Sequence, residues 1–260
     1  TIVSNAGRYG LFITGGGYNR IAGSTLLAGT HIDGGSMYNA FSQSAFRSNS
    51  DVVHALYLQT ASSNSVTQCF LSNPSGDTLY IGGGTGSHAN TVSQSTMTSG
   101  FADGVGLFVA GSSNVFTSNY VQNAAGNAAI FDSASANAVI QSTFVSNALS
   151  YVGLYLNDSP RTILSRISVI NSADGAVRIT FYDVVSFDRS VVTGFETGII
   201  LEDSADFSVT LSTVIGNTMA GLWLEDSLSP TIEDSYIQGS TGVYVTNSDG
   251  TLIQRNTLAG

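Results

Sequence analysis

Charge is scarce in this chain, and lysine is absent. Charged residues make up 10% of the 260 residues, so the polar surface must consist mainly of serine, threonine, asparagine, glutamine and glycine. All 8 basic residues are arginine, and the net charge is -10. Such an acidic balance argues against nucleic acid or an anionic membrane surface as a partner.

Cysteine, proline and long apolar runs are also rare. Cys69 is the only cysteine, so no disulfide can form within the chain. No apolar run approaches the length of a membrane-spanning helix, and we expect no membrane insertion. The chain starts at Thr1 without a signal-peptide pattern and stops within a repeat. We therefore interpret it as a segment of a longer protein.

An alternating strand pattern recurs about every 23 residues. In "GLYLNDS", "GIILEDS" and "GLWLEDS", which start at Gly153, Gly198 and Gly221, apolar residues flank a central position on both sides. Such alternation is typical of a strand with one buried face. The central positions form a column: Phe12, His31, Tyr57, Tyr80, Phe108, Phe131, Tyr155, Arg178, Ile200, Trp223 and Tyr244. We expect this column on an outer face and the flanking residues in the core.

A second motif follows each strand and ends in Asn or Gly. Examples are "FRSN" at 46–49, "FLSN" at 70–73 and "FVSN" at 144–147. The closing residues are Asn49, Asn73, Gly100, Asn123, Asn147, Asn171, Gly194, Asn217 and Gly239. Because Asn and Gly tolerate a left-handed backbone, we predict a sharp, left-handed corner at each of them.

Small, mostly polar residues stand just before this motif. They are Thr25, Ala45, Cys69, Thr96, Asn119, Thr143, Ser190, Thr213, Ser235 and Asn256. Stacked one above another, such side chains can form a hydrogen-bonded ladder. Short strands, tight corners and the absence of helical periodicity predict an all-β solenoid, in which each coil pairs in parallel with its neighbours at a spacing of ~4.8 Å.

The repeat, written "GIxLxxS…I…N/SxI…N", resembles the right-handed parallel β-helix proteins of the pectin-lyase-like superfamily. The resemblance covers nearly the whole chain, from "TIVSN" to "QRNTLAG". It implies a right-handed, single-stranded parallel β-helix of about eleven coils, with residues 1–260 forming one domain. That superfamily includes polysaccharide lyases, glycoside hydrolases, epimerases, phage tailspikes and non-catalytic surface proteins, so the resemblance implies the fold and leaves the function open.

Sequence segments that would indicate an enzyme of that superfamily are missing. Resemblance to polygalacturonases would require "NTD", "DD", "GHG" and "RIK" in order, and mannuronate epimerases carry "DPH"; the chain contains none of these sets. Without lysine, a lysine-dependent route is closed. His31, His54 and His88 share no metal-ligand spacing, so we expect them to be solvated or locally hydrogen-bonded.

Two glutamates in successive repeats are the exception. Glu202 and Glu225 hold the same outward position, and Arg178 stands one repeat away. Stacking would place the glutamates ~4.8 Å apart, near the separation of about 5 Å in retaining glycosidases, and like charges so close would raise one pKa. The candidate catalytic residues are therefore Glu202, Glu225 and Arg178. Alternatively, the adjacent Asp203 and Asp226 join the glutamates to hold Ca²⁺, the only cofactor considered, or all these carboxylates are simply hydrated.

The segment "AIFD" at 129–132 raises a question of register. In strict register Phe131 points outward and Asp132 is buried. Because burying an unpaired carboxylate is costly, we predict a slip of one residue. Ile130 then points out, Phe131 points in, and Asp132 joins the column of Glu202.

Aromatic residues dominate the outward column, and a second outward column is predicted at Phe46, Phe70, Tyr120, Phe144 and Tyr236. Contiguous exposed rings mark a binding surface, although stacked rings also reinforce neighbouring strands. The candidate substrate-binding residues are Tyr155, Trp223 and Tyr244. Alternation places Trp223 between Ile200 and Tyr244, with one ring face free for a sugar.

Two functions remain open. The first is a non-catalytic, extracellular or cell-surface segment used in adhesion, in carbohydrate or partner binding, or as a structural spacer. The alternative is a polysaccharide-acting enzyme, either a glycoside hydrolase, a lyase or an epimerase, with a groove on one sheet. A polysaccharide or surface glycan is the expected partner of either. The open strand edges of the terminal coils also predict end-to-end or lateral association with other copies or with the parent chain.

Overall fold

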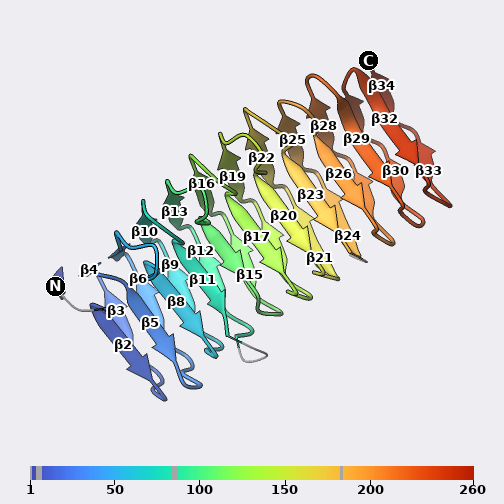
Figure 1. The fold of residues 1–260 in the computed structure, drawn as a ribbon. Coiled ribbons are helices and arrows are strands. Elements are labelled where there is room, and N and C mark those ends of the chain that lie inside the picture. Colours follow the sequence, from blue (N-terminus) through green and yellow to red (C-terminus); the bar gives the residue numbers. More distant parts are fainter. Residues whose placement is uncertain (1, 4–7, 84–86, 182–183) are drawn as a thin grey trace.

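Three parallel β-sheets wind along a rod in the computed structural model, which describes residues 2–3, 8–83, 87–181 and 184–260. Each coil contributes one strand to each sheet, and the coils stack from the N-terminal to the C-terminal end (Figure 1). Neighbours within a sheet come from successive coils, and their pairing is parallel. Within the described ranges, no helix is long and apolar enough to cross a membrane.

The strands fall into three sets, which we name sheets A, B and C. Sheet A contains β1 (Ile2–Val3), β4 (Thr25–Leu27), β7 (Ala45–Arg47), β10 (Phe70–Asn73), β13 (Thr96–Ser99), β16 (Tyr120–Asn123), β19 (Thr143–Ser146), β22 (Ser168–Asn171), β25 (Val191–Gly194), β28 (Thr213–Gly216), β31 (Tyr236–Gln238) and β34 (Thr257–Ala259). Sheet B contains β2 (Leu11–Thr14), β5 (Thr30–Asp33), β8 (Leu56–Gln59), β11 (Leu79–Gly82), β14 (Leu107–Val109), β17 (Ala129–Asp132), β20 (Leu154–Asn157), β23 (Val177–Thr180), β26 (Ile199–Glu202), β29 (Ala220–Glu225) and β32 (Thr241–Thr246). Sheet C contains β3 (Arg20–Ala22), β6 (Ala40–Ser42), β9 (Ser65–Thr67), β12 (Thr91–Ser93), β15 (Val115–Thr117), β18 (Ala138–Ile140), β21 (Thr162–Ser165), β24 (Val185–Asp188), β27 (Ser208–Thr210), β30 (Thr231–Glu233) and β33 (Leu252–Gln254).

Alternation decides which side chains fill the rod. In β26, Ile199 and Leu201 are fully buried, whereas Ile200 between them lies on the outer face. The inward residues of all three sheets join into one apolar cluster that extends from Leu26 to Ile237. The prediction of an all-β parallel solenoid of about eleven coils is confirmed, since the sheets hold 12, 11 and 11 strands.

The predicted slip at 129–132 is also confirmed. Ile130 pairs with Tyr155 and Phe131 pairs with Leu156, so Phe131 is buried in the core. Asp132 lies on the outer face, where its Oδ1 accepts a hydrogen bond of 2.7 Å from Nδ2 of Asn157. The carboxylate therefore remains accessible to solvent and also accepts a hydrogen bond from a side chain.

The predicted left-handed corners are wrong. No member of the Asn and Gly column has a positive φ. Residues with positive φ instead follow the strands of sheets B and C. Those after sheet C are Gly23, Gln43, Gln68, Gln94, Ser118, Gln141, Arg166, Arg189, Leu211, Asp234 and Arg255, and those after sheet B include Thr60, Ser133, Asp158, Asp203 and Asp226. The buried amide of Asn73 donates to the carbonyls of Ser50, Val53 and Asp77, at 2.9 to 3.1 Å. Asparagine therefore serves here to satisfy buried carbonyl groups.

The predicted polar ladder exists, but half of its residues were placed one position too late. Its members include Ser24, Ser44, Cys69, Ser95, Asn119, Ser142, Ser190, Ser212, Ser235 and Asn256. In eight of them, all except Ser24 and Cys69, the side-chain oxygen accepts from the backbone N–H of the preceding coil, as between Ser95 and Cys69 at 3.1 Å. Thr25, Ala45, Thr96, Thr143 and Thr213 belong instead to the adjoining sheet A strands.

A second ladder, which the sequence analysis missed, stands just before the sheet C strands. Six asparagines, Asn19, Asn39, Asn64, Asn90, Asn114 and Asn137, stack through hydrogen bonds from Nδ2 to the Oδ1 of the next coil, at 2.8 to 3.2 Å. In the five asparagines after Asn19, Oδ1 also accepts the backbone N–H of the preceding asparagine. The ladder supplies hydrogen-bond partners for backbone N–H and carbonyl groups at this corner over six coils.

The second outward aromatic column is only partly correct. Phe70, Tyr120 and Tyr236 are exposed on sheet A. Phe46 and Phe144 are buried, because the register pairs Phe46 with Leu71 and Phe144 with Val121. Two of the five rings therefore belong to the core, and no continuous aromatic row runs along sheet A.

Candidate functional site

The outer face of sheet B carries two columns of side chains. The first is Phe12, His31, Tyr57, Tyr80, Phe108, Ile130, Tyr155, Arg178, Ile200, Trp223 and Tyr244, each the register partner of the next. The second lies two residues further along the strands and is polar from β17 onwards: Asp132, Asn157, Thr180, Glu202, Glu225 and Thr246. This register brings the predicted catalytic and sugar-binding residues onto one face.

Arg178 and Glu202 form a two-pronged ion pair between β23 and β26. Nε of Arg178 lies 3.0 Å from Oε2 of Glu202, and Nη2 lies 2.9 and 2.8 Å from Oε1 and Oε2. The side chains are 47% and 26% exposed, so the pair contributes at most about 1 kcal/mol to stability. Guanidinium has five N–H donors, more than this pair uses, and the exposed Arg178 side chain can offer the others to a ligand.

Trp223 lies where alternation predicted it. Leu222 and Leu224 are fully buried, and the half-buried Trp223 ring packs on Tyr244, with centroids 4.6 Å apart and planes tilted by 45°. Nε1 of Trp223 donates to Oε2 of Glu225 at 3.1 Å, which fixes the ring. Trp223 and Tyr244 line a shallow hollow of about 170 Å³ together with Met219.

A neighbouring groove of about 360 Å³ gathers Tyr155, Arg178, Glu202 and Asp203. The Tyr155 hydroxyl lies 3.2 Å from Oγ1 of Thr180, which donates to Oδ1 of Asn157 at 2.9 Å. Three further polar or aromatic lining residues are Asn127, Tyr151 and Ser150. The candidate residues therefore divide between two adjacent hollows, because Trp223 and Tyr244 do not line this one.

Asp203 and Asp226 occupy the turns that follow β26 and β29. Both are left-handed, with φ of 49° and 48°, a conformation that aspartate tolerates better than most residues. They line a hollow of about 190 Å³ with Ser204. In the part of the chain that the structure describes, no three acidic, histidine or cysteine side chains gather as ligands of one metal ion.

A stack of rings at the other end of sheet B was not predicted as a unit. His31 lies parallel to Tyr57 with centroids 4.7 Å apart, and Tyr57 and Tyr80 are 4.9 Å apart. His54 enters from the link before β8 and stacks on Tyr80 at 4.8 Å. Nδ1 of His54 lies 3.4 Å from Oδ2 of Asp77. His31 and His54 are thus packed in a cluster that spacing alone did not reveal, whereas His88 is exposed.

Acidification should destabilise the folded chain through His54. Burial lowers its pKa from an ordinary 6.5 to about 4 and raises the pKa of Asp77, so lost hydration outweighs attraction within the pair. Between these two pH values the unfolded chain binds a proton at this histidine and the folded chain does not. The free energy of unfolding should therefore fall by about 3 kcal/mol as the pH drops to 4, while protonation of Asp77, whose pKa is raised, acts in the opposite direction.

Urea unfolding near pH 7 and near pH 4.5 measures this effect. H54Q should lose part of the pH dependence, whereas H88Q, which changes an exposed histidine, should keep it. An identical pH dependence in H54Q and the parent chain would assign the effect to other groups.

Residues 131–260 match a family model described as the right handed beta helix region. A comparison with curated proteins gives no match. The chain is similar to the crystal structure of a mutant of the periplasmic alginate epimerase AlgG, with 10% identity, a TM-score of 0.66, and coverage of 95% of this chain and 70% of that one. It is also similar to the Dettilon tailspike protein, with 12% identity, a TM-score of 0.50, and coverage of 96% and 60%. At such identities the likeness establishes the fold alone.

Proposed function

The chain belongs to the right-handed β-helix family, and from this premise we propose that it is a non-catalytic, carbohydrate-binding rod located outside the cell or at its surface. A polysaccharide lies across the outer face of sheet B, over β20 to β32. The observation that carries the proposal is the adjacency of the Trp223–Tyr244 hollow to the groove that holds Arg178 and Glu202.

The chemistry of the two hollows suits a sugar chain. The apolar face of a pyranose ring packs on the exposed side of Trp223, while its hydroxyls meet the polar column of Thr180, Glu202 and Glu225. Glu225 fixes the Trp223 ring, and Arg178 and Glu202 fix each other, before any ligand binds. Such preorganisation reduces the ordering cost of binding.

The ion pair favours binding over catalysis. Glu202 accepts all three hydrogen bonds from Arg178, and Glu225 accepts the indole N–H of Trp223. Both glutamates thus act on neighbouring side chains as positioning groups. One observation favours the enzymatic alternative, a glycoside hydrolase, lyase or epimerase: Glu202 and Glu225 are direct register partners, as a pair of catalytic carboxylates would be.

Replacing Trp223 should weaken glycan binding at least about tenfold, because buried aromatic anchors dominate binding energy. A glycan array with the parent chain selects the probe, and calorimetry with that glycan measures the affinity of W223A. The same glycan should shield the single tryptophan of the parent chain from acrylamide quenching. Y120A is the matched control, since Tyr120 is a 38% exposed ring on sheet A.

Three outcomes would contradict or redirect the proposal. Equal losses in W223A and Y120A would remove sheet B as the binding face. Cleavage or epimerisation of the bound glycan that disappears in E202Q and E225Q would establish the enzymatic alternative. Binding that is lost on calcium chelation and in D203N would place a calcium ion between the glycan and Asp203 and Asp226.

A further inference from the structure

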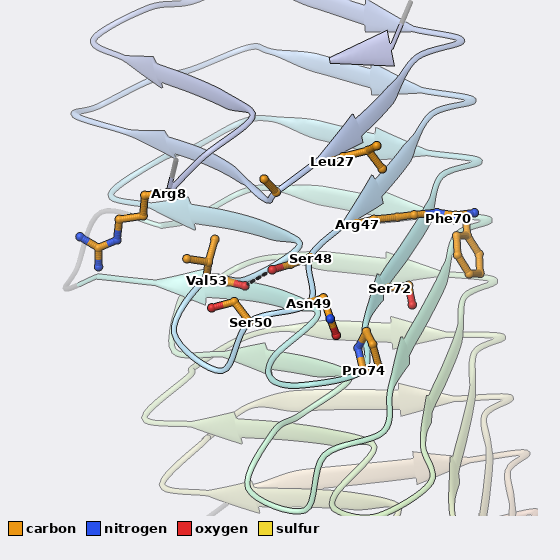
Figure 2. A pocket seen from close by; sticks show the side chains of 11 residues that line it. Arg8, Leu27, Arg47, Ser48, Asn49, Ser50, Val53, Phe70, Ser72 and Pro74 are labelled. Carbon is orange, nitrogen blue, oxygen red and sulfur yellow. Dashed lines mark hydrogen bonds between the residues drawn. The ribbon is translucent and has the colours of Figure 1, made fainter. Parts of the chain in front are cut away.

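A further hollow of about 750 Å³ lies at the corner between sheets A and B, near the N-terminal end of the rod. It arises from unequal links between two coils. β4 and β5 are joined by Ala28 and Gly29 alone, both left-handed, with φ of 79° and 78°. β7 and β8 are joined by the longer loop 48–55, which lies in the next coil beside this short turn (Figure 2).

The loop 48–55 is fixed in shape. The Ser48 hydroxyl donates to the Val53 carbonyl at 2.6 Å, closing the loop on itself. Val53 packs against the turn between β4 and β5 so closely that a Cβ at Gly29 would lie 2.5 Å from its Cγ1. The hollow is therefore a feature of the folded coil.

The lining is positive in an acidic chain. Two of the eight arginines, Arg8 and Arg47, line the hollow, and none of the 18 acidic residues does; Asp51 belongs to the same loop but not to the lining. Among the residues that the structure describes, the arginines in ion pairs are Arg178, Arg189 and Arg255. Figure 2 shows Arg8 and Arg47 on opposite sides of Val53.

An aromatic ring and small polar groups complete the lining. The guanidinium carbon of Arg47 lies 5.7 Å from the ring centroid of Phe70, which is 39% exposed. Ser72 is the register partner of Arg47 on the adjacent strand, and Asn49 and Ser50 border the hollow from the loop. This contact orients the guanidinium, and the ring leaves an apolar platform beside it.

We propose that this hollow is a second glycan site, selective for an acidic sugar that bears a carboxylate or a sulfate group. The guanidinium of Arg47 pairs with the anionic group through two parallel hydrogen bonds, and Arg8, at the other end of the hollow, adds only to its positive charge. The sugar ring packs on Phe70, and Ser72 and Asn49 bond its hydroxyls. The net charge of -10 disfavours a densely charged polyanion, so the ligand is a glycan with isolated acidic residues.

Ligand-observed NMR and calorimetry test the site with three matched disaccharides: one with glucuronate, its carboxyl-reduced neutral form and a sulfated form of the neutral sugar. The parent chain should bind the anionic forms at least about tenfold more tightly than the neutral form. R47A should remove this preference, R47K should restore part of it, and high salt should weaken it. Preference for only one anionic form would identify the carboxylate or the sulfate as the source.

S72E provides an independent test that keeps both arginines. A carboxylate at position 72 would pair with Arg47 on the adjacent strand and exclude the anion, so S72E should lose the preference as R47A does. R20A, at an exposed arginine of sheet C, should bind as the parent chain does. Circular dichroism of each variant confirms the fold.

The outcomes separate this site from the one on sheet B. Loss of anion binding in W223A, with R47A unaffected, would move the acidic sugar to sheet B and overturn the proposal. Equal affinity for the neutral and anionic disaccharides would overturn it as well. Anion binding that survives W223A but not R47A and S72E would support it whether or not the sheet B proposal holds.

Discussion

The N90A variant should lose about 3 to 5 kcal/mol of its free energy of unfolding. Asn90 is fully buried in the middle of the asparagine ladder. Its Oδ1 accepts from the backbone N–H and from Nδ2 of Asn64, at 2.9 and 3.1 Å. Its Nδ2 donates to the Ala61 carbonyl and to Oδ1 of Asn114, at 2.9 and 3.1 Å. Alanine would leave two buried donors of Asn64 without an acceptor, and each such group costs about 1 to 3 kcal/mol.

An exposed row of stacked glutamines, Gln43, Gln68 and Gln94, supplies the control. Gln94 Oε1 accepts from Gln68 Nε2 at 3.2 Å on the surface, where water can replace the partner. The Q94A variant should therefore lose less than about 1 kcal/mol. Chemical denaturation followed by circular dichroism measures both variants. Equal losses would mean that burial of the asparagine ladder does not set its energetic weight.

The fold was predictable because apolar alternation and a repeat length recur through the chain. Leu222 and Leu224 had to face the core, so Trp223 had to face out, and the structure confirms this. The slip that moves Asp132 outward followed from the cost of a buried charge, which no local pattern expresses. Aligning residues 129–132 with the other repeats by residue type would have given the wrong register, and the free-energy cost of burying Asp132 indicated the right one.

Chemical identity alone could not place the residues of sheet A. Phe46 and Phe70 open similar tetrapeptides, yet Phe46 is buried in the second position of β7 and Phe70 is exposed in the first position of β10. Aligning the tetrapeptides therefore shifted several ladder residues by one position. A phenylalanine is stable on either face when its neighbours are apolar, so only the pairing of coils decides.

The asparagine ladder could have been predicted from a spacing that recurs in the sequence. Each of its members stands two residues before an inward apolar residue of sheet C, as in Asn39 with Phe41 and Asn90 with Val92. The spacing of asparagine and a core residue recurs in six coils and predicts a buried amide at a fixed corner. The histidine cluster had no such signal, because His54 and Asp77 belong to links of different coils.

The candidate site was predictable to the level of a shared face. Register alone brought Glu202, Glu225 and Arg178 together, because strands of equal phase stack. The bidentate contact of Arg178 and the division of the face into two hollows depend on rotamers and link lengths, which a repeat pattern does not encode. The arginine-lined hollow also depends on link lengths, because it forms where a two-residue turn in one coil lies beside the long loop 48–55 of the next.

A large effect of a single methyl group is expected at Gly194. Its φ is not positive, so glycine is not needed there for backbone freedom. It is needed for space: a Cβ would lie 2.0 Å from the Thr197 carbonyl oxygen and 2.9 Å from the Ala176 backbone nitrogen. These two atoms form a 3.0 Å hydrogen bond between successive coils, so the methyl group would occupy the position of that bond.

G194A should therefore be less stable than the parent chain by about 4 kcal/mol or more, since backbone atoms on both sides cannot rotate away as a side chain can. Gly175, in the link before β23, is the matched control, because a Cβ there would meet nothing nearer than 3.5 Å and its φ is not positive. G175A should change the free energy of unfolding by less than about 0.5 kcal/mol. Denaturation of both variants measures the difference, and a G194A chain as stable as G175A would show that the coils at this corner lie further apart than the structure places them.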